Sequence, residues 1–149
     1  MFETILTNVT DSYLETALWS SVDYNEDGEG EEFDANYCVD DFTEDARSAA
    51  ESDCRALIEL MMNTDCSAHG EYDNLFDAAD DLQGYERIGH DFWLTRNGHG
   101  AGFWDGDYVS RTHNQDYGKM ICELLYAEFG RYSELNLFAD GEGCVEIDG

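Results

Sequence analysis

The sequence predicts an α+β fold: a single domain of about four helices with a small antiparallel sheet built from two hairpins. Two observations lead to this prediction. Four segments repeat apolar residues at helical spacing, and two segments alternate apolar residues on either side of a glycine-containing turn. The chain has 149 residues, of which 42% are hydrophobic, so we expect one acidic α+β domain spanning residues 1–149.

The first two helices are predicted by residues that cap helix N-termini. Ser12 and Glu15 form a capping box ahead of "YLETALWSSV", residues 13–22, whose apolar positions fall on one helical face. Thr43 is a favourable N-cap, and two acidic residues follow it in the first turn. The apolar face that comes next predicts a long amphipathic helix that ends near residue 63.

Two further helices follow. The segment "EYDNLFDAADDL", residues 71–82, places apolar residues on one side and acids on the other, which predicts a short helix. Thr112 and Gln115 form a second capping box, and the apolar positions after them predict a helix that ends at Gly130.

A central hairpin is predicted in "GHDFWLTRNGHGAGFWDGDY", residues 89–108. Asn97-Gly98 is a strong signal for a two-residue type I′ turn between antiparallel strands. With this turn, Phe92, Leu94, Ala101 and Phe103 would face the core, and Trp93 and Trp104 would lie on the opposite face.

The second hairpin is predicted in the C-terminal segment "ELNLFADGEGCVEI", residues 134–147. Leu135 and Leu137 alternate with polar residues before a glycine-rich turn, and Val145 and Ile147 alternate after it.

The net charge of the chain is extreme. It has 35 Asp and Glu against 7 Lys and Arg, a formal net charge of −28, and no basic residue precedes Arg47. Phosphate binding needs cations, so this charge excludes nucleic acid and anionic membranes as direct partners. It favours basic proteins, divalent cations or a very salty solvent.

The charge leads to our principal hypothesis, an acidic protein that mimics DNA and binds and inhibits a basic DNA-binding or defence protein. Duplex DNA carries two negative charges per base pair, so 28 net negative charges correspond to about 14 base pairs. The expected partner-binding surface is made of carboxylates in the acidic loop and on the outer sides of two helices. These are Asp23, Glu26, Asp27, Glu29, Glu31, Glu32, Asp40, Asp41, Glu44, Asp45, Glu51, Asp53, Glu59, Asp73, Asp77, Asp80 and Asp81.

A calcium-binding loop is a second interpretation of "DYNEDGEGEEFD", Asp23 to Asp34. Asp23, Asn25 and Asp27 match the first three ligand positions of an EF-hand, Gly28 its sharp turn, and Asp34 its last ligand. Against it, the eighth position is a glycine, the last ligand is Asp instead of Glu, and no second hand follows. We therefore expect no metal and no cofactor, and interpret the segment as a solvated acidic loop.

The central segment supports two more hypotheses. Trp93 and Trp104 could anchor a protein partner if both are exposed. His90, Asp91, His99 and Asp105 could serve acid–base chemistry, but no nucleophile or third metal ligand stands at a characteristic spacing. We therefore assign no catalytic residue and expect a structural role for most of the segment.

The five cysteines form no CxxC pair, which is typical of free thiols in a reducing compartment. The N-terminal segment "MFETILTNVTD" lacks the basic and apolar regions of a signal peptide, and no run approaches about 20 apolar residues, the length of a membrane span. We therefore expect a soluble intracellular protein.

The motif "GHDFWLTRNGHGAGFWD" resembles a family of small, largely uncharacterised proteins of tailed bacteriophages and prophages. "ALWSS" at 17–21, "DANY" at 34–37 and "DC" at 53–54 extend the likeness over most of the chain. The resemblance implies a phage origin and a place in the cytoplasm of an infected bacterium, and it implies no activity. The insert "EDGEGEE" at 26–32 and the extreme acidity depart from the family pattern.

Overall fold

A computed structural model describes residues 1–24, 27–99, 101–130 and 134–148. Within these ranges the chain forms five α-helices, three short 3₁₀ helices and three two-stranded antiparallel ribbons, an α+β arrangement as predicted. The α-helices are α1 (Phe2–Ser20), α2 (Glu44–Met62), α3 (Leu75–Gln83), α4 (Glu86–Arg96) and α5 (Tyr117–Phe129). The 3₁₀ helices are η1 (Phe33–Ala35), η2 (Val39–Asp41) and η3 (Ser67–His69). The strands are β1 (Val22–Tyr24), β2 (Gly30–Glu32), β3 (Val109–Ser110), β4 (Gln115–Asp116), β5 (Asn136–Ala139) and β6 (Val145–Asp148).

Helix α1 begins ten residues before the predicted capping box, at Phe2 instead of Ser12. Its buried face already includes Leu6 and Val9, so the apolar stripe continues toward the N-terminus. The backbone carbonyl of Ser12 accepts a hydrogen bond from the hydroxyl of Thr16 at 2.8 Å inside the helix. The predicted start of this helix was therefore wrong, because a Ser–Glu pair does not mark a helix N-terminus when the apolar face of the helix continues before it.

The other predicted helices are present with adjusted starts. Thr43 caps α2, its hydroxyl accepting from the Ala46 amide at 3.2 Å, as predicted. Helix α3 begins at Leu75, because the Asn74 side chain accepts from the Asp77 amide at 2.8 Å. Helix α5 is capped by Asp116 instead of Thr112 and ends before Gly130 as expected.

The predicted central hairpin was wrong: residues 86–96 form helix α4. Asn97 and Gly98 end this helix instead of turning a hairpin. The Asn97 side-chain amide donates to the Trp93 carbonyl at 2.9 Å, and Gly98 has a φ of 65°. Asn-Gly suits both structures, because a helix C-terminus and a type I′ turn each need a left-handed residue.

The C-terminal hairpin is confirmed. Strands β5 and β6 pair with Leu137 opposite Ile147 and Ala139 opposite Val145, which places the predicted apolar residues on one face. The three ribbons are separate, so the hairpins do not join in one sheet. The β1–β2 ribbon occupies the segment that was expected to be a loop.

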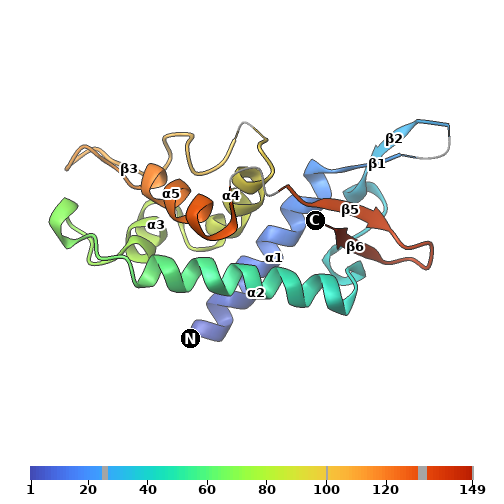
Figure 1. Cartoon of the computed structure of the whole chain (residues 1–149), viewed down its shortest axis with the longest axis horizontal. Coiled ribbons are helices and arrows are strands. Elements are labelled where there is room, and N and C mark those ends of the chain that lie inside the picture. Colours follow the sequence, from blue (N-terminus) through green and yellow to red (C-terminus); the bar gives the residue numbers. More distant parts are fainter. Residues whose placement is uncertain (25–26, 100, 131–133, 149) are drawn as a thin grey trace.

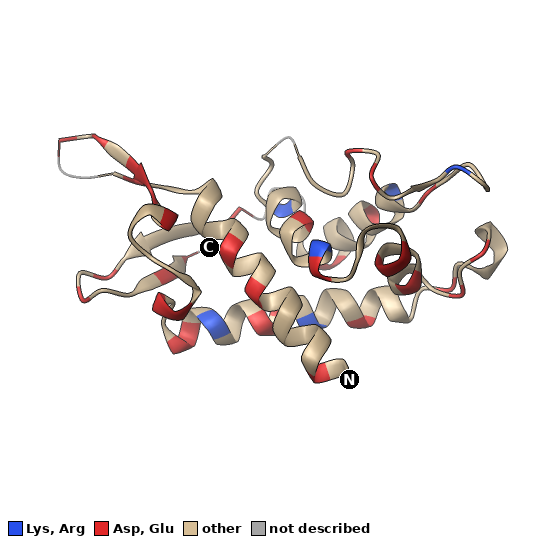
Figure 2. Cartoon of the chain, turned by 180° about the vertical axis from the view of Figure 1, so that it is seen from behind, with Lys and Arg blue, Asp and Glu red and all other residues tan. Residues whose placement is uncertain are grey.

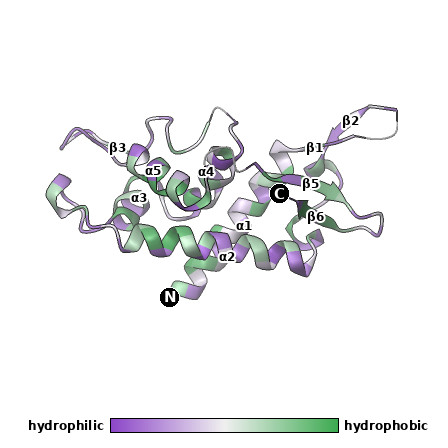
Figure 3. Ribbon diagram, viewed as in Figure 1, coloured by the Kyte–Doolittle hydropathy of each residue, from purple (hydrophilic) through white to green (hydrophobic). Residues whose placement is uncertain are grey.

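Helix α2 runs along the long axis of the molecule and connects its two ends (Figure 1). At one end the amide of Thr43 donates to the carbonyl of Val145 at 3.0 Å, which ties β6 to the start of α2. At the other end α2 contacts α3. In Figure 3 the C-terminal half of α2 is largely hydrophobic, whereas the projecting β1–β2 ribbon is hydrophilic toward its tip.

Helices α1 and α4 cross in direct backbone contact at Gly89. A Cβ atom at Gly89 would meet the carbonyl oxygen of Val9 and would lie 2.8 Å from the backbone nitrogen of Tyr13. No real Cβ sits that close to backbone, so the crossing requires glycine. The crossing buries α4 on almost every side, including Trp93 at 1% exposure.

The first prediction concerns this crossing. Replacing Gly89 by Ala should lower the free energy of unfolding by about 1–3 kcal/mol, because the added methyl group forces the two helix backbones apart. Urea denaturation followed by circular dichroism measures it, with Ser52→Ala at an exposed position of α2 as the control. An increase of about 1 kcal/mol, the helix-propensity gain of Ala over Gly, would contradict the close crossing.

Candidate functional site

Carboxylates gather at one end of the molecule, where the β1–β2 and β5–β6 ribbons, η1, η2 and the start of α2 lie (Figure 2). We call this surface the acidic end. Its carboxylates are Asp23, Asp27, Glu29, Glu31, Glu32, Asp34, Asp40, Asp41, Glu44, Asp45, Asp140, Glu142, Glu146 and Asp148. All are exposed except Asp23, Asp41 and Glu146, which are half-buried. The segments 22–45 and 136–148 that form it contain no Lys or Arg.

Backbone hydrogen bonds and buried apolar side chains connect the acidic end to the rest of the protein. The Phe33 amide donates to the Ser21 carbonyl at 3.1 Å, and the rings of Phe33 and Phe42 are buried. The nearest cation in the sequence, Arg47, donates to the Val39 carbonyl at 2.8 Å and pairs with Asp11 at 3.3 Å. This guanidinium therefore holds η2 against α1 and α2.

The carboxylates predicted on α2 divide between the surface and the interior. Glu44, Asp45, Glu51 and Glu59 are exposed. Asp53 is half-buried instead, and its carboxylate accepts from Arg96 at 2.8 Å. Asp53 thus serves an internal ion pair and does not belong to the outward-facing set.

The four predicted carboxylates before and on α3, Asp73, Asp77, Asp80 and Asp81, are exposed but lie toward the opposite end of the molecule from β1–β2 (Figure 1). Three of them make local hydrogen bonds: Asp77 accepts from the Asn74 side-chain amide at 3.2 Å, Asp80 from the Tyr85 amide at 3.0 Å, and Asp81 from the Tyr72 hydroxyl at 2.6 Å. The predicted surface therefore falls into two groups joined by α2. Glu26 and Asn25 lie outside the described residues.

The segment 23–34 has the geometry of a hairpin. Asp23, the first position of the expected calcium-loop pattern, lies in β1 directly opposite Glu31 of β2. Among the residues that the structure describes, no group of three or more His, Cys, Asp or Glu side chains could hold a metal ion. The described carboxylates of this ribbon are therefore arranged by strand pairing, and one of them, Glu31, accepts from the Asn36 side chain at 3.0 Å.

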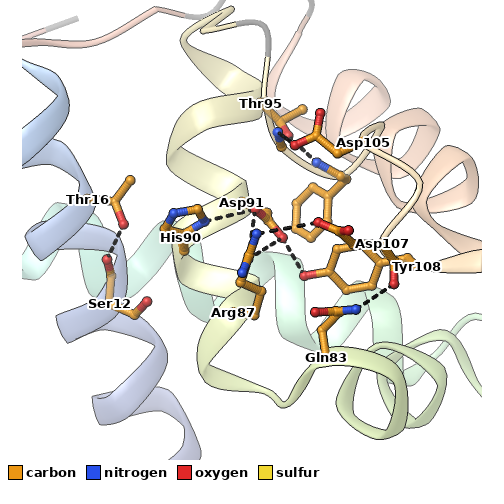
Figure 4. Close-up of polar contacts among 12 residues, drawn as sticks. Ser12, Thr16, Gln83, Arg87, His90, Asp91, Thr95, Asp105, Asp107 and Tyr108 are labelled. Carbon is orange, nitrogen blue, oxygen red and sulfur yellow. Dashed lines mark hydrogen bonds and ion pairs between the residues drawn. The ribbon is translucent and has the colours of Figure 1, made fainter.

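The buried carboxylate of Asp91 is the centre of a polar cluster that reaches the surface (Figure 4). The Asp91 side chain is 1% exposed. Its carboxylate accepts from the Tyr108 hydroxyl at 2.6 Å and lies 2.9 Å from Nδ1 of His90 and 3.4 Å from Nε of Arg87. Arg87 also pairs with Asp107 at 3.4 Å. Burial, together with the Asp91 carboxylate, raises the pKa of the Tyr108 phenol, so this hydroxyl stays a donor.

The cluster explains only part of the predicted acid–base set. Of its members only His90 and Asp91 are in contact, and the ring centre of His90 also lies 5.8 Å from that of Trp19. His99 follows α4 at its far end, where it lines a cavity of about 250 Å³ with Glu134. Asp105 accepts from the Gly102 amide at 3.1 Å within a turn. The four candidates therefore do not converge on one reactive centre.

Arg96, which directly precedes the predicted Asn97-Gly98 turn, is buried at 6% exposure. Its guanidinium donates to the Tyr13 hydroxyl at 3.1 Å and to Asp53, and it lies 5.3 Å from the ring centre of Phe92 and 5.1 Å from that of Phe129. It thereby links α1, α2, α4 and α5. Sequence reasoning missed this role, because a cation beside Asn-Gly looks like a solvated turn residue.

The predicted pair of tryptophan anchors does not exist. Trp93 is buried, and its indole N–H donates to the Ser20 hydroxyl at 2.9 Å. Trp104 is 38% exposed and lines a cavity of about 360 Å³ with Cys122 and Tyr126. The prediction failed because it required strand alternation, and residues 86–96 are helical.

The five cysteines are all free, and Cys54, Cys66 and Cys122 are buried. Burial raises the pKa of the Cys122 thiol to about 11, so it stays protonated near neutral pH. Within the described ranges no helix has the length and apolar character needed to cross a membrane.

Comparison with protein-family models, curated proteins and solved structures finds nothing that matches this chain. The likeness to phage proteins therefore stays a prediction from the sequence motifs that carry it.

A second prediction tests whether the Asp91 cluster is structural. Tyr108→Phe should lower the free energy of unfolding by about 1.5–3 kcal/mol, because it removes a buried donor to a carboxylate. Tyr24→Phe, at a residue 69% exposed, is the matched control and should change stability by less than about 0.5 kcal/mol. Equal effects of the two substitutions, measured by urea denaturation, would show that the cluster does not stabilise the fold.

Proposed function

We propose that the protein is an acidic decoy that binds a basic DNA-binding protein and occupies the surface on which that protein would hold DNA. The observation that carries the proposal is the acidic end, fourteen carboxylates on segments without a single Lys or Arg. Because nothing in these segments neutralises the charge, the potential over this surface is strongly negative. The resemblance to phage proteins would place the target in an infected bacterium.

The internal ion pairs support the proposal. Arg47, Arg55, Arg87 and Arg96 all pair with carboxylates of the chain itself. Arg55, Arg87 and Arg96 pair with carboxylates outside the acidic end, and Arg47, which binds the Val39 carbonyl at its border, is paired with Asp11. A basic partner would meet fixed carboxylates on a folded scaffold, which reduces the conformational cost of binding.

The third prediction uses two variants with the same change in charge. One removes five carboxylates of the acidic end: Glu29→Gln, Glu31→Gln, Glu32→Gln, Glu44→Gln and Asp45→Asn. The control removes five exposed carboxylates outside both the acidic end and the set expected from the sequence: Glu15→Gln, Glu86→Gln, Glu123→Gln, Glu128→Gln and Glu134→Gln.

Affinity capture from bacterial lysate should retain a DNA-binding protein at about 50 mM salt and release it at higher salt or on addition of duplex DNA. The acidic-end variant should retain at least about tenfold less of that protein, and the control variant should retain nearly as much as the unmodified chain. A captured protein that duplex DNA does not displace would refute DNA mimicry. Equal losses of the captured protein in both variants would refute a localised binding surface.

A further inference from the structure

The β1–β2 ribbon combines its carboxylates with an exposed apolar face. Side chains alternate along a strand, so Val22 and Tyr24 share one face, and Asp23 lies on the other, opposite Glu31. Val22 is 41% exposed and Tyr24 is 69% exposed. Large apolar groups at such exposure, inside a strongly charged surface, are candidates for contact with another molecule.

Gly30 creates this face. It lies opposite Tyr24 in the ribbon, and a Cβ atom there would lie 2.9 Å from the ring carbon Cε1 of Tyr24 and would also meet Val22. The missing side chain leaves room for both apolar groups to lie over the ribbon. The Tyr24 ring therefore lies over the backbone at Gly30, and the residue is still 69% exposed to solvent.

Carboxylates lie on both faces of the ribbon beside this ring, Glu32 on the Tyr24 face and Glu31 on the other. Asp27, Glu29, Glu31 and Glu32 follow along the turn and β2, and all four are exposed. The ribbon also projects away from the body of the molecule (Figure 1). A partner groove could therefore take in this ribbon before the rest of the acidic end makes contact.

We propose that the β1–β2 ribbon is the specific contact for arginine side chains of the basic partner, an inference that rests on the proposed decoy function. A planar guanidinium can stack on the Tyr24 ring while its N–H groups donate in pairs to neighbouring carboxylates. A lysine ammonium can approach the ring as a point charge, but it is more strongly hydrated than a guanidinium and makes neither planar stacking nor a bidentate contact. The ribbon thus fits a groove lined by arginine, the residue that DNA-binding proteins most often use to contact guanine and phosphate.

The fourth prediction uses defined probes, fluorescent nonamers of arginine and of lysine, which carry the same charge. Fluorescence anisotropy at about 50 mM salt should show tighter binding of the arginine peptide to the unmodified chain. Tyr24→Ala should weaken arginine-peptide binding about two- to fivefold and weaken lysine-peptide binding clearly less. Tyr24→Phe keeps the ring and should keep the preference, whereas Trp104→Ala, an exposed aromatic residue outside the acidic end, should alter neither affinity.

Loss of both affinities to the same extent in Tyr24→Ala, or no loss of either, would overturn the arginine contact. The proposed function has a separate readout: Glu29→Gln, Glu31→Gln and Glu32→Gln together should weaken both peptides. If the amide substitutions weaken both peptides but Tyr24→Ala does not discriminate between them, the acidic surface stands and the arginine contact fails. If the amide substitutions change nothing, the acidic end is not the binding surface and both proposals fail.

Discussion

The backbone contact between α1 and α4 at Gly89 is the constraint on which the rest of the structure depends. It places α4 in the interior, so polar residues of that helix are buried and need partners from other elements. The Asp91 carboxylate accepts a hydrogen bond from Tyr108, and the Trp93 indole donates one to Ser20. The Arg96 guanidinium donates to Tyr13 and to Asp53. One close crossing therefore accounts for most of the unusual residues in the central motif.

This dependence explains which elements the sequence could predict. Helix α2 and the β5–β6 ribbon followed from local signals, the Thr43 cap and an alternating pattern around glycines. Helix α4 could not be predicted in this way, because Asn97-Gly98 is compatible with a helix C-terminus and with a hairpin turn. Only the packing against α1 decides between the two structures. The exposure of the acidic residues was largely predictable from their type. Their separation into two groups was not, because it depends on where distant segments lie.

The charged residues serve two different purposes in the folded chain. Inside, single carboxylates such as Asp53 and Asp91 are matched with arginine or phenol donors and join helices to one another. Outside, the carboxylates of the acidic end have no matching cation in their own segments. Such concentrated negative charge opposes folding through mutual repulsion, which the shared apolar core must outweigh. This cost is easiest to understand if the surface has a cationic partner.

In this account the interior of the protein holds the fold, and the acidic end binds the partner. The most direct test is amide hydrogen exchange of the protein with and without saturating arginine nonamer. The account predicts slower exchange in residues 22–45 and 136–148 on addition of the peptide, and unchanged exchange in residues 86–108. Slower exchange centred on residues 86–108, around His90 and Asp91, would contradict it. That result would move the binding site to the central motif.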